Sequence, residues 1–234
     1  VRLQPRPGLR HQNPVYAAMV KSLDESVGRI LDRLRERSLA DNTLVIFTSD
    51  NGGYIGIDRQ SGQAVPVTNN APLRSGKGSL YEGGVRVPLL VRWPGRAARA
   101  AVCAEPVTLA DLFSTVLAAA SARPPAPVDG LDLRPLLQYP SARLGRDALC
   151  FHYPHYYDTT TPASAVRSGD WKLIEYLEDG RLELYNLAVD PAEQTNLAAK
   201  EPARVNELRG RLDTWRRDVG AKMPSPNPSF KPRK

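Results

Sequence analysis

The sequence predicts an α/β domain followed by a smaller α+β subdomain that contains an antiparallel hairpin and a terminal helix. Two observations lead to this prediction. A long amphipathic pattern over residues 14–39 runs directly into the β-branched and aromatic stretch 43–48, which is the order of a helix and a strand in an α/β sheet. Near the C-terminus, two β-rich runs surround Asp179 and Gly180 and are followed by a second amphipathic pattern.

The first helix is predicted to begin after Asn13, a good N-cap, with Pro14 at the tolerated first position. Its apolar residues recur at spacings of three and four and form a single stripe. The stripe consists of Val15, Met19, Leu23, Val27, Ile30, Leu31 and Leu34. A short turn over residues 40–42 leads to the strand 43–48, whose uninterrupted apolar run is typical of a parallel strand covered on both faces.

The centre of the chain alternates long loops with a few regular elements. Residues 52–70 form a polar loop without a clear period, and a stretch with four glycines continues it to residue 84. Loops of this length in compact domains are usually functional or disordered. The elements that follow are a strand, a helix with Asp111 in its first turn and a proline-rich connection, at residues 86–93, 108–121 and 124–130.

The C-terminal part has a different pattern. Residues 147–158 predict a short strand and then an aromatic, histidine-containing loop. Residues 171–187 predict a hairpin around Asp179-Gly180, a dipeptide suited to tight primed turns. The terminal helix is expected over residues 202–220, and one side of it carries Val205, Leu208, Leu212 and Trp215. We therefore expect two domains, at residues 1–146 and 147–234.

Composition excludes several classes of protein. No apolar stretch approaches the roughly 18 residues of a membrane span, and a net charge of +7 without a run of five Lys or Arg residues argues against nucleic acid as a partner. Cys103 and Cys150 are too few for a cysteine-built zinc site and leave either one disulfide or two separate buried thiols. Without an N-terminal Met or a targeting leader, the chain is expected to be part of a longer protein. The sequence gives no indication of an oligomeric state.

Polar residues follow the first predicted strand at its carboxyl end. Ligands of open α/β sheets gather at such ends, and Asp50 and Asn51 offer hard oxygen atoms that suit Ca²⁺ or Mg²⁺. Gly52 and Gly53 allow the backbone to turn sharply after them. The same four residues are also ordinary turn-forming sequence. The pattern alone therefore indicates either a metal site or a turn.

Lys77 stands between two glycines in SGKGS and is a second candidate site residue. A long-stemmed ammonium flanked by flexible backbone can reach an anionic group, and the N–H groups of a glycine-rich loop can join it. The spacing is not that of a Walker loop. The alternative is a solvated loop lysine.

His152 and His155 lie within four residues of each other in an aromatic stretch. Such a pair can bind metal, act as an acid or base, or hold an anionic substrate. The alternative is a structural one, with both imidazoles hydrogen-bonded inside an aromatic cluster.

In combination these stretches resemble a known family. DNTLVIFTSDNGG, APLRSGKGSLYEGGVRVPLLVRWPG and the T-x-x-D-L-F helix are similar to the C-terminal half of sulfatases, whose fold is related to alkaline phosphatase. RSGDWKLIEYLEDGRLELYNLAVDPAEQTNLA resembles the C-terminal subdomain of bacterial arylsulfatases and N-acetylgalactosamine-6-sulfatase-like enzymes. The resemblance runs from about Asn13 to the end. It implies part of an alkaline phosphatase-like mixed sheet flanked by helices, followed by the small α+β subdomain.

The resemblance implies roles for all five candidate residues. Asp50 and Asn51 match the Asp–Asn pair that helps to hold a calcium ion in the family, with Mg²⁺ less suited. Lys77 matches the lysine that binds the substrate sulfate and takes part in catalysis. His152 or His155 is implied to approach the substrate from the C-terminal subdomain, as a histidine does in some relatives.

The implied reaction is hydrolysis of the sulfate ester of an aryl compound or a sugar. Its nucleophile is a formylglycine hydrate, made in the family from the first residue of Cys/Ser-x-Pro-x-Arg. Neither Cys103 nor Cys150 lies in such a sequence. We therefore expect the nucleophile and the other metal ligands upstream, and residues 1–234 alone to be inactive. The resemblance also implies an exported protein, whether periplasmic, extracellular or lysosomal.

Two other functions are compatible with the sequence. A phosphodiesterase or phosphonate hydrolase of the same superfamily shares the fold, but such enzymes usually have Asp and His ligands for two metals, whereas Asn51 and Gly52 follow Asp50 here. A non-catalytic truncated protein that binds sulfated polyanions by its basic charge is the other alternative.

Overall fold

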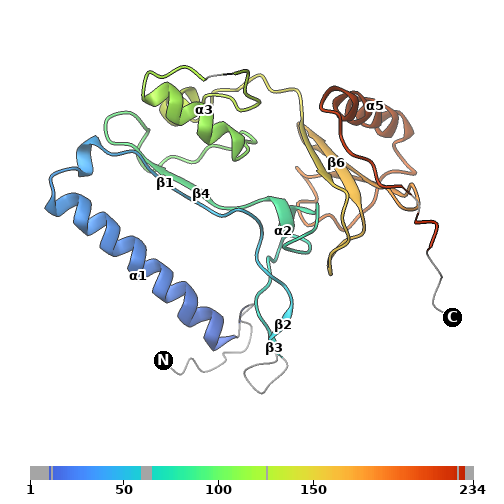
Figure 1. Cartoon of the computed structure of the whole chain (residues 1–234), viewed down its shortest axis with the longest axis horizontal. Coiled ribbons are helices and arrows are strands. Elements are labelled where there is room, and N and C mark those ends of the chain that lie inside the picture. Colours follow the sequence, from blue (N-terminus) through green and yellow to red (C-terminus); the bar gives the residue numbers. More distant parts are fainter. Residues whose placement is uncertain (1–10, 12, 59–64, 125, 226, 230–234) are drawn as a thin grey trace. The chain divides into compact units, whose positions relative to one another are not determined.

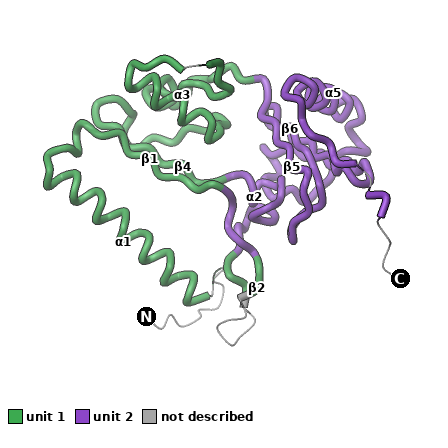
Figure 2. The backbone as a smooth tube through the Cα atoms, viewed as in Figure 1, with its two compact units in different colours: residues 1–50, 56–68, 87–146 green, residues 51–55, 69–86, 147–234 purple. Residues whose placement is uncertain are grey.

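The computed structural model describes residue 11 and residues 13–58, 65–124, 126–225 and 227–229. The chain divides into two compact units, which Figure 2 shows in different colours. The first unit consists of residues 1–50, 56–68 and 87–146, and the second of residues 51–55, 69–86 and 147–234. The second unit therefore takes two short segments from the first 86 residues. The division into a catalytic domain and a C-terminal subdomain at residue 146 stays a prediction.

In the first unit, α1 (Pro14–Glu36) confirms the predicted first helix (Figure 1). Asn13 is its N-cap, since its Oδ1 accepts hydrogen bonds from the N–H groups of Val15 and Tyr16 at 2.9 and 3.0 Å. The predicted apolar stripe does not form a core among the described residues, because α1 has no buried residue. Its members Val15, Met19, Leu23 and Ile30 are each at least half exposed.

The turn at 40–42 is a short 3₁₀ helix, η1 (Ala40–Asn42), and the predicted strand after it is β1 (Val45–Thr48). β1 pairs with β4 (Leu89–Arg92) in an antiparallel manner, with Val45 opposite Arg92. The prediction of a parallel strand covered on both faces is therefore wrong for this pair, and β1 is only half-buried. An apolar run predicts that a strand is present, but the direction of its partner depends on a loop of some forty residues that has no period.

Two helices complete the first unit, α3 (Ala110–Ala119) and α4 (Arg134–Gln138), together with the short strands β2 (Ile57–Asp58) and β3 (Val65–Pro66). Asp111 of α3 is fully buried. Its carboxylate accepts hydrogen bonds from the N–H groups of Thr108 and Leu131, each at 2.8 Å, and pairs with both Nη atoms of Arg146. The acidic residue in the first turn thus joins the start of α3 to two later loops.

The second unit contains a four-stranded antiparallel sheet. Its strands follow the order of the sequence: β5 (Leu149–Tyr153), β6 (Ala163–Ser168), β7 (Trp171–Tyr176) and β8 (Leu182–Asn186). The predicted hairpin is β7–β8. Its loop covers residues 177–180 and so is longer than the predicted two-residue turn, although Gly180 has the expected positive φ of 70°.

Both faces of this sheet are covered. On one face, Leu173 and its neighbours pack against α5 (Pro202–Asp218), the predicted terminal helix. On the other face, Ile174 and its neighbours pack against the segment around Tyr81 and α2 (Glu82–Val85). Figure 1 shows β6 between α5 and α2. Since successive residues of a strand point to opposite faces, β7 contributes to two cores.

Two predictions from composition are tested by the described residues. None of the helices described is long and apolar enough to cross a membrane. Both cysteines are free thiols. Cys150 is half-buried, but Cys103 is exposed, so the expectation of a buried thiol is wrong for Cys103.

Candidate functional site

Asp50 and Asn51 follow β1, as the sequence predicts. Asp50 is exposed and Asn51 is half-buried. Across the part of the chain that the structure describes, no three His, Cys, Asp or Glu side chains lie together as a metal site would require. The two residues are hard oxygen donors, but Ca²⁺ takes about 6–8 oxygen ligands. They suit part of a calcium coordination shell and not the whole of it.

Gly52 and Gly53 are needed for close packing as well as for a turn. The N–H of Gly52 donates to the carbonyl of Gly84 at 2.9 Å. A β-carbon at Gly52 would lie 2.8 Å from the carbonyl carbon of Gly83 and closer still to its oxygen. The carbonyl of Gly53 accepts from the N–H of Lys77 at 3.1 Å. The segment that carries Asn51 therefore lies directly against the loop that carries Lys77.

Lys77 is exposed, on a loop whose backbone is firmly held. The loop is closed by a 2.9 Å hydrogen bond from the N–H of Gly83 to the carbonyl of Arg74. A β-carbon at Gly76 would lie 2.7 Å from Asn70 Nδ2, and one at Gly78 would lie 2.7 Å from Cγ of Tyr157. The glycines around Lys77 thus allow close contact, and the predicted flexibility of this loop is not what the packing indicates.

Four of the backbone N–H groups that could form the predicted cradle are already hydrogen-bonded. The N–H groups of Lys77, Ser79, Gly83 and Gly84 all donate to carbonyls of residues 53–81. These four N–H groups are not available to an anion, whereas the exposed side chain of Lys77 can reach one. An exposed cation on a rigid support is the arrangement that preorganised charge stabilisation requires.

The sequence did not identify the residues that support this loop. Asn70 accepts a hydrogen bond from the N–H of Gly53 through Oδ1 and donates through Nδ2 to the carbonyls of Gly53 and Ser75. Thr159 Oγ1 donates to the carbonyl of Lys77 at 2.7 Å. The contacts of Asn70 with Gly53 and of Thr159 with Lys77 join residues 17 and 82 positions apart, and no local pattern predicts them.

The two candidate histidines have different surroundings. Both ring nitrogens of His152 are hydrogen-bonded, Nδ1 with Ser164 Oγ at 2.7 Å and Nε2 with the carbonyl of Lys222 at 2.9 Å. His155 is exposed, and its ring lies edge-on to Tyr153 with 5.3 Å between centroids. His152 therefore fits the structural alternative, whereas His155 is accessible to a ligand.

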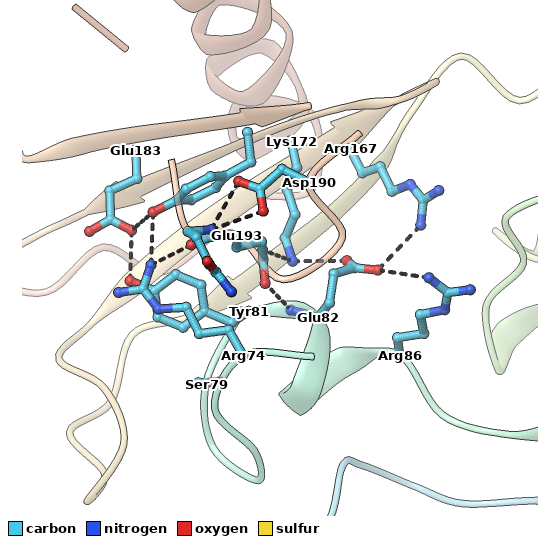
Figure 3. A network of polar contacts seen from close by, with 12 residues as sticks. Arg74, Ser79, Tyr81, Glu82, Arg86, Arg167, Lys172, Glu183, Asp190 and Glu193 are labelled. Atoms are coloured by element: carbon cyan, nitrogen blue, oxygen red, sulfur yellow. Dashed lines mark hydrogen bonds and ion pairs between the residues drawn. The ribbon is translucent and has the colours of Figure 1, made fainter. Parts of the chain in front are cut away.

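A buried network of charges lies beside Tyr81 and Glu82, which follow Lys77 in the same loop (Figure 3). Its centre is Lys172 of β7, whose Nζ lies 3.0 Å from Glu82 Oε1 and 2.9 Å from Glu193 Oε1. All three side chains are at most 3% exposed. Beside them, burial raises the pKa of Tyr81, whose hydroxyl donates to Glu183 at 2.6 Å. A hydroxyl held protonated in this way is a hydrogen-bond donor and not a base.

Two family models match this chain. The family model described as Sulfatase matches residues 6–122, and the one described as N-sulphoglucosamine sulphohydrolase, C-terminal, matches residues 76–218. The chain belongs to the sulfatase family. The resemblance inferred from SDNGG and SGKG is thereby confirmed.

Individual sulfatases show how much of the family this chain covers. It is 38% identical to a sulfatase from Formosa agariphila over 231 residues, which covers 88% of this chain and 40% of the relative. It is 35% identical to human N-acetylgalactosamine-6-sulfatase over 168 residues, which covers 66% of this chain and 31% of the relative. The chain thus spans less than half the length of these curated relatives.

A solved structure gives the fold. A protein in complex with its substrate D-glucosamine-2-N,6-O-disulfate superposes with a TM-score of 0.70 at 24% identity, over 86% of this chain and 39% of that one. At this identity the match shows the fold alone. Together with the family, it confirms the predicted alkaline phosphatase-like α/β fold with its antiparallel C-terminal sheet and terminal helix.

Proposed function

We propose that this chain carries the sulfate-binding lysine of a sulfuric ester hydrolase. Membership of the sulfatase family supports the reaction class. The observation that carries the proposal is the exposed ammonium of Lys77 on a loop bound to Gly53, two residues after Asn51. Sulfate transfer places negative charge on the equatorial oxygens, and a preorganised cation stabilises that charge.

The proposed metal ligands of this chain are Asp50 and Asn51. Both offer the hard oxygen atoms that calcium takes, and Mg²⁺ is less suited to an irregular set of donors. A divalent ion bound there would supply Lewis-acid stabilisation of the sulfate group. In this proposal Lys77 binds the sulfate group and holds it in place.

The proposed nucleophile is the formylglycine that the family resemblance implies. Neither Cys103 nor Cys150 is followed by the Pro and Arg of the required sequence. In this proposal the nucleophile is therefore supplied from outside residues 1–234, and these residues by themselves do not turn over substrate.

We propose a sulfated sugar as substrate, with an aryl sulfate as a simpler analogue. The name of the human relative, an N-acetylgalactosamine-6-sulfatase, and the disulfated glucosamine bound in the solved structure support this class. His155 is the proposed substrate contact of the C-terminal loop, because it is exposed beside Tyr153. His152 is assigned to structure, since both its nitrogens are already hydrogen-bonded.

The test uses the protein as its gene encodes it, including any residues before Val1, and a chromogenic aryl sulfate. Lys77→Ala should lower kcat/KM by about 10²–10³-fold, as removal of a preorganised charge-stabilising group does. Lys200→Ala is the matched control, since Lys200 is also exposed and belongs to the same unit. Equal activity of the two variants would contradict the role of Lys77.

The metal and histidine assignments have their own tests. Chelation should abolish hydrolysis, Ca²⁺ should restore it better than Mg²⁺, and Asp50→Ala should weaken the restoration by Ca²⁺. His155→Ala should raise KM without changing the thermal midpoint, whereas His152→Ala should lower the thermal midpoint. Restoration by Ca²⁺ that is unchanged in Asp50→Ala would remove that residue from the proposed metal site.

A further inference from the structure

The buried charges at the base of the Lys77 loop form a clamp that consists of Glu82, Lys172 and Glu193. Glu193 Oε2 accepts the backbone N–H of Glu82 at 2.6 Å, while Lys172 Nζ lies between the two carboxylates. On its other side, Glu82 Oε2 faces Nη1 of Arg167 at 3.6 Å and Nη1 of Arg86 at 4.0 Å (Figure 3). The first residue of α2 is thus held through both its main chain and its side chain.

Glu193 also holds the other end of the loop. Its carbonyl accepts a hydrogen bond from Arg74 Nη1 at 2.9 Å, and the same Nη1 donates to the hydroxyl of Tyr185 at 2.9 Å. The Arg74 guanidinium lies over the ring of Tyr81, with 3.9 Å to the ring centroid. Arg74 and Gly83 close the loop by their backbone hydrogen bond, so one glutamate contacts both sides of its base.

Glu193 has an unusual backbone conformation at the point where it contacts both Glu82 and Arg74. Its φ is 51°, in the left-handed region that side-chain-bearing residues rarely adopt. Asp190 fixes the turn, since its carbonyl accepts the N–H of Glu193 at 3.1 Å and its carboxylate accepts the N–H groups of Gln194 and Thr195. A non-glycine residue kept in this conformation by its surroundings is a recognised sign of a functional constraint.

Stability alone does not explain three buried charges. The desolvation of buried ions offsets much of their attraction, and replacing buried ion pairs by apolar residues of similar volume is often neutral or stabilising. An ionic triad is favourable only in the geometry in which its charged atoms meet. It therefore holds the base of the loop that carries Lys77 in one position.

We propose that Glu82, Lys172 and Glu193 are positioning residues that fix the Lys77 loop on the C-terminal sheet. This inference rests on the proposed function of Lys77 as the sulfate-binding cation. The connection between Glu82 and Lys77 is short and closely packed. The N–H of Gly83 donates to the carbonyl of Arg74, and a β-carbon at Gly84 would lie 2.6 Å from the carbonyl oxygen of Gly76. A shift of Glu82 therefore moves the support of Lys77.

The first test does not depend on activity. Hydrogen–deuterium exchange of residues 74–84 is measured in the gene-encoded protein, with β6 amides reporting global unfolding. Lys172→Met should speed exchange of 74–84 relative to β6 on the order of a hundredfold, since two buried carboxylates lose their partner. Glu193→Gln is a milder variant, because glutamine keeps the shape of the side chain and an oxygen that accepts the N–H of Glu82. It should speed exchange of residues 74–84 by a smaller factor. This variant tests the proposal if Lys172→Met does not fold.

Leu208→Ala is the matched control, because Leu208 is buried in the core on the α5 face of the same sheet, whereas the clamp residues meet on the opposite face. It should speed exchange of 74–84 and of β6 equally. If Lys172→Met and Glu193→Gln also speed both segments equally, or leave 74–84 protected, the clamp is overturned.

The second test is a double-mutant cycle on aryl sulfate hydrolysis. Lys172→Met should lower kcat/KM strongly when Lys77 is present and have little further effect in Lys77→Ala, because the clamp acts through that lysine. Additive effects would overturn the positioning role. If the unmodified protein hydrolyses no sulfate ester, the proposed function fails, and the exchange experiment still decides whether the clamp exists.

Discussion

Gly52→Ala is the substitution that most directly tests the packing of the candidate site. The added β-carbon would lie 2.8 Å from the carbonyl carbon of Gly83, whereas carbon atoms in contact lie about 3.5–4.0 Å apart. The two segments must therefore separate by at least about 0.7 Å. The 2.9 Å hydrogen bond from Gly52 to Gly84 would then exceed the length at which such bonds contribute.

The expected cost follows from these two effects. Overpacking of a close contact costs about 1–3 kcal/mol, and the lost hydrogen bond adds about 0.5–1.5 kcal/mol. Gly52→Ala should therefore lower the free energy of unfolding by about 1.5–4.5 kcal/mol. Urea denaturation followed by circular dichroism measures this change, provided that the slope with denaturant is the same for both proteins.

Gly210→Ala is the same chemical change with the opposite expected sign. Gly210 is exposed in the middle of α5, and an added β-carbon there meets nothing within 4 Å. Alanine should stabilise this helix position by up to about 1 kcal/mol. A Gly52→Ala protein that is as stable as Gly210→Ala would refute the argument that close backbone contact requires glycine at residue 52.

Three further predictions concern buried polar groups. Burial raises the pKa of the Cys150 thiol to about 11, whereas Cys103 is exposed. Iodoacetamide at about pH 8 should therefore alkylate Cys103 first. Equal rates of alkylation of the two cysteines, measured by mass spectrometry, would contradict this prediction. Asp111→Asn leaves the charge of Arg146 unpaired and should cost about 3–5 kcal/mol in urea unfolding, whereas a loss below about 1 kcal/mol would show that the pair is not needed. Burial raises the pKa of Glu193 above 4.5, although the ammonium of Lys172 opposes this shift. The contribution of Glu193 to stability is therefore complete below pH 4.5 and is lost as pH rises through the pKa of the folded state. The stability of the wild type relative to Glu193→Gln should accordingly fall as pH rises above about 4.5, and a constant or rising difference would refute the shift.

The elements that the sequence predicts well are those whose signal is local. Asn13 caps α1 through its own side chain, and Leu208 and Leu212 of α5 are buried as their spacing requires. The sequence does not predict β6, because Ala163–Ser168 has mostly small residues and no clear alternation. The partner of β1 could not be read either, because strand direction depends on the whole intervening chain.

Lys172 shows why the support of the site could not be predicted. In the run W-K-L-I-E-Y it reads as the solvent-facing residue of a strand with one buried face. It is buried because Glu82, 90 residues earlier, covers that face. The candidate residues Asn51 and Lys77 were identified through the resemblance to sulfatases, and the packing of their segments through Gly53 became visible only in the fold.

Because the second unit is built from three separate segments of the chain, it cannot be produced whole as one continuous C-terminal fragment. A polypeptide that starts at residue 147 would contain the whole sheet and α5 but would lack residues 51–55 and 69–86. One face of its sheet would be bare at Ile174, and Lys172 would have lost one of its two carboxylates. A soluble domain for crystallisation or antibody production should therefore keep residues 51–86 on the same molecule, or supply them as a second chain.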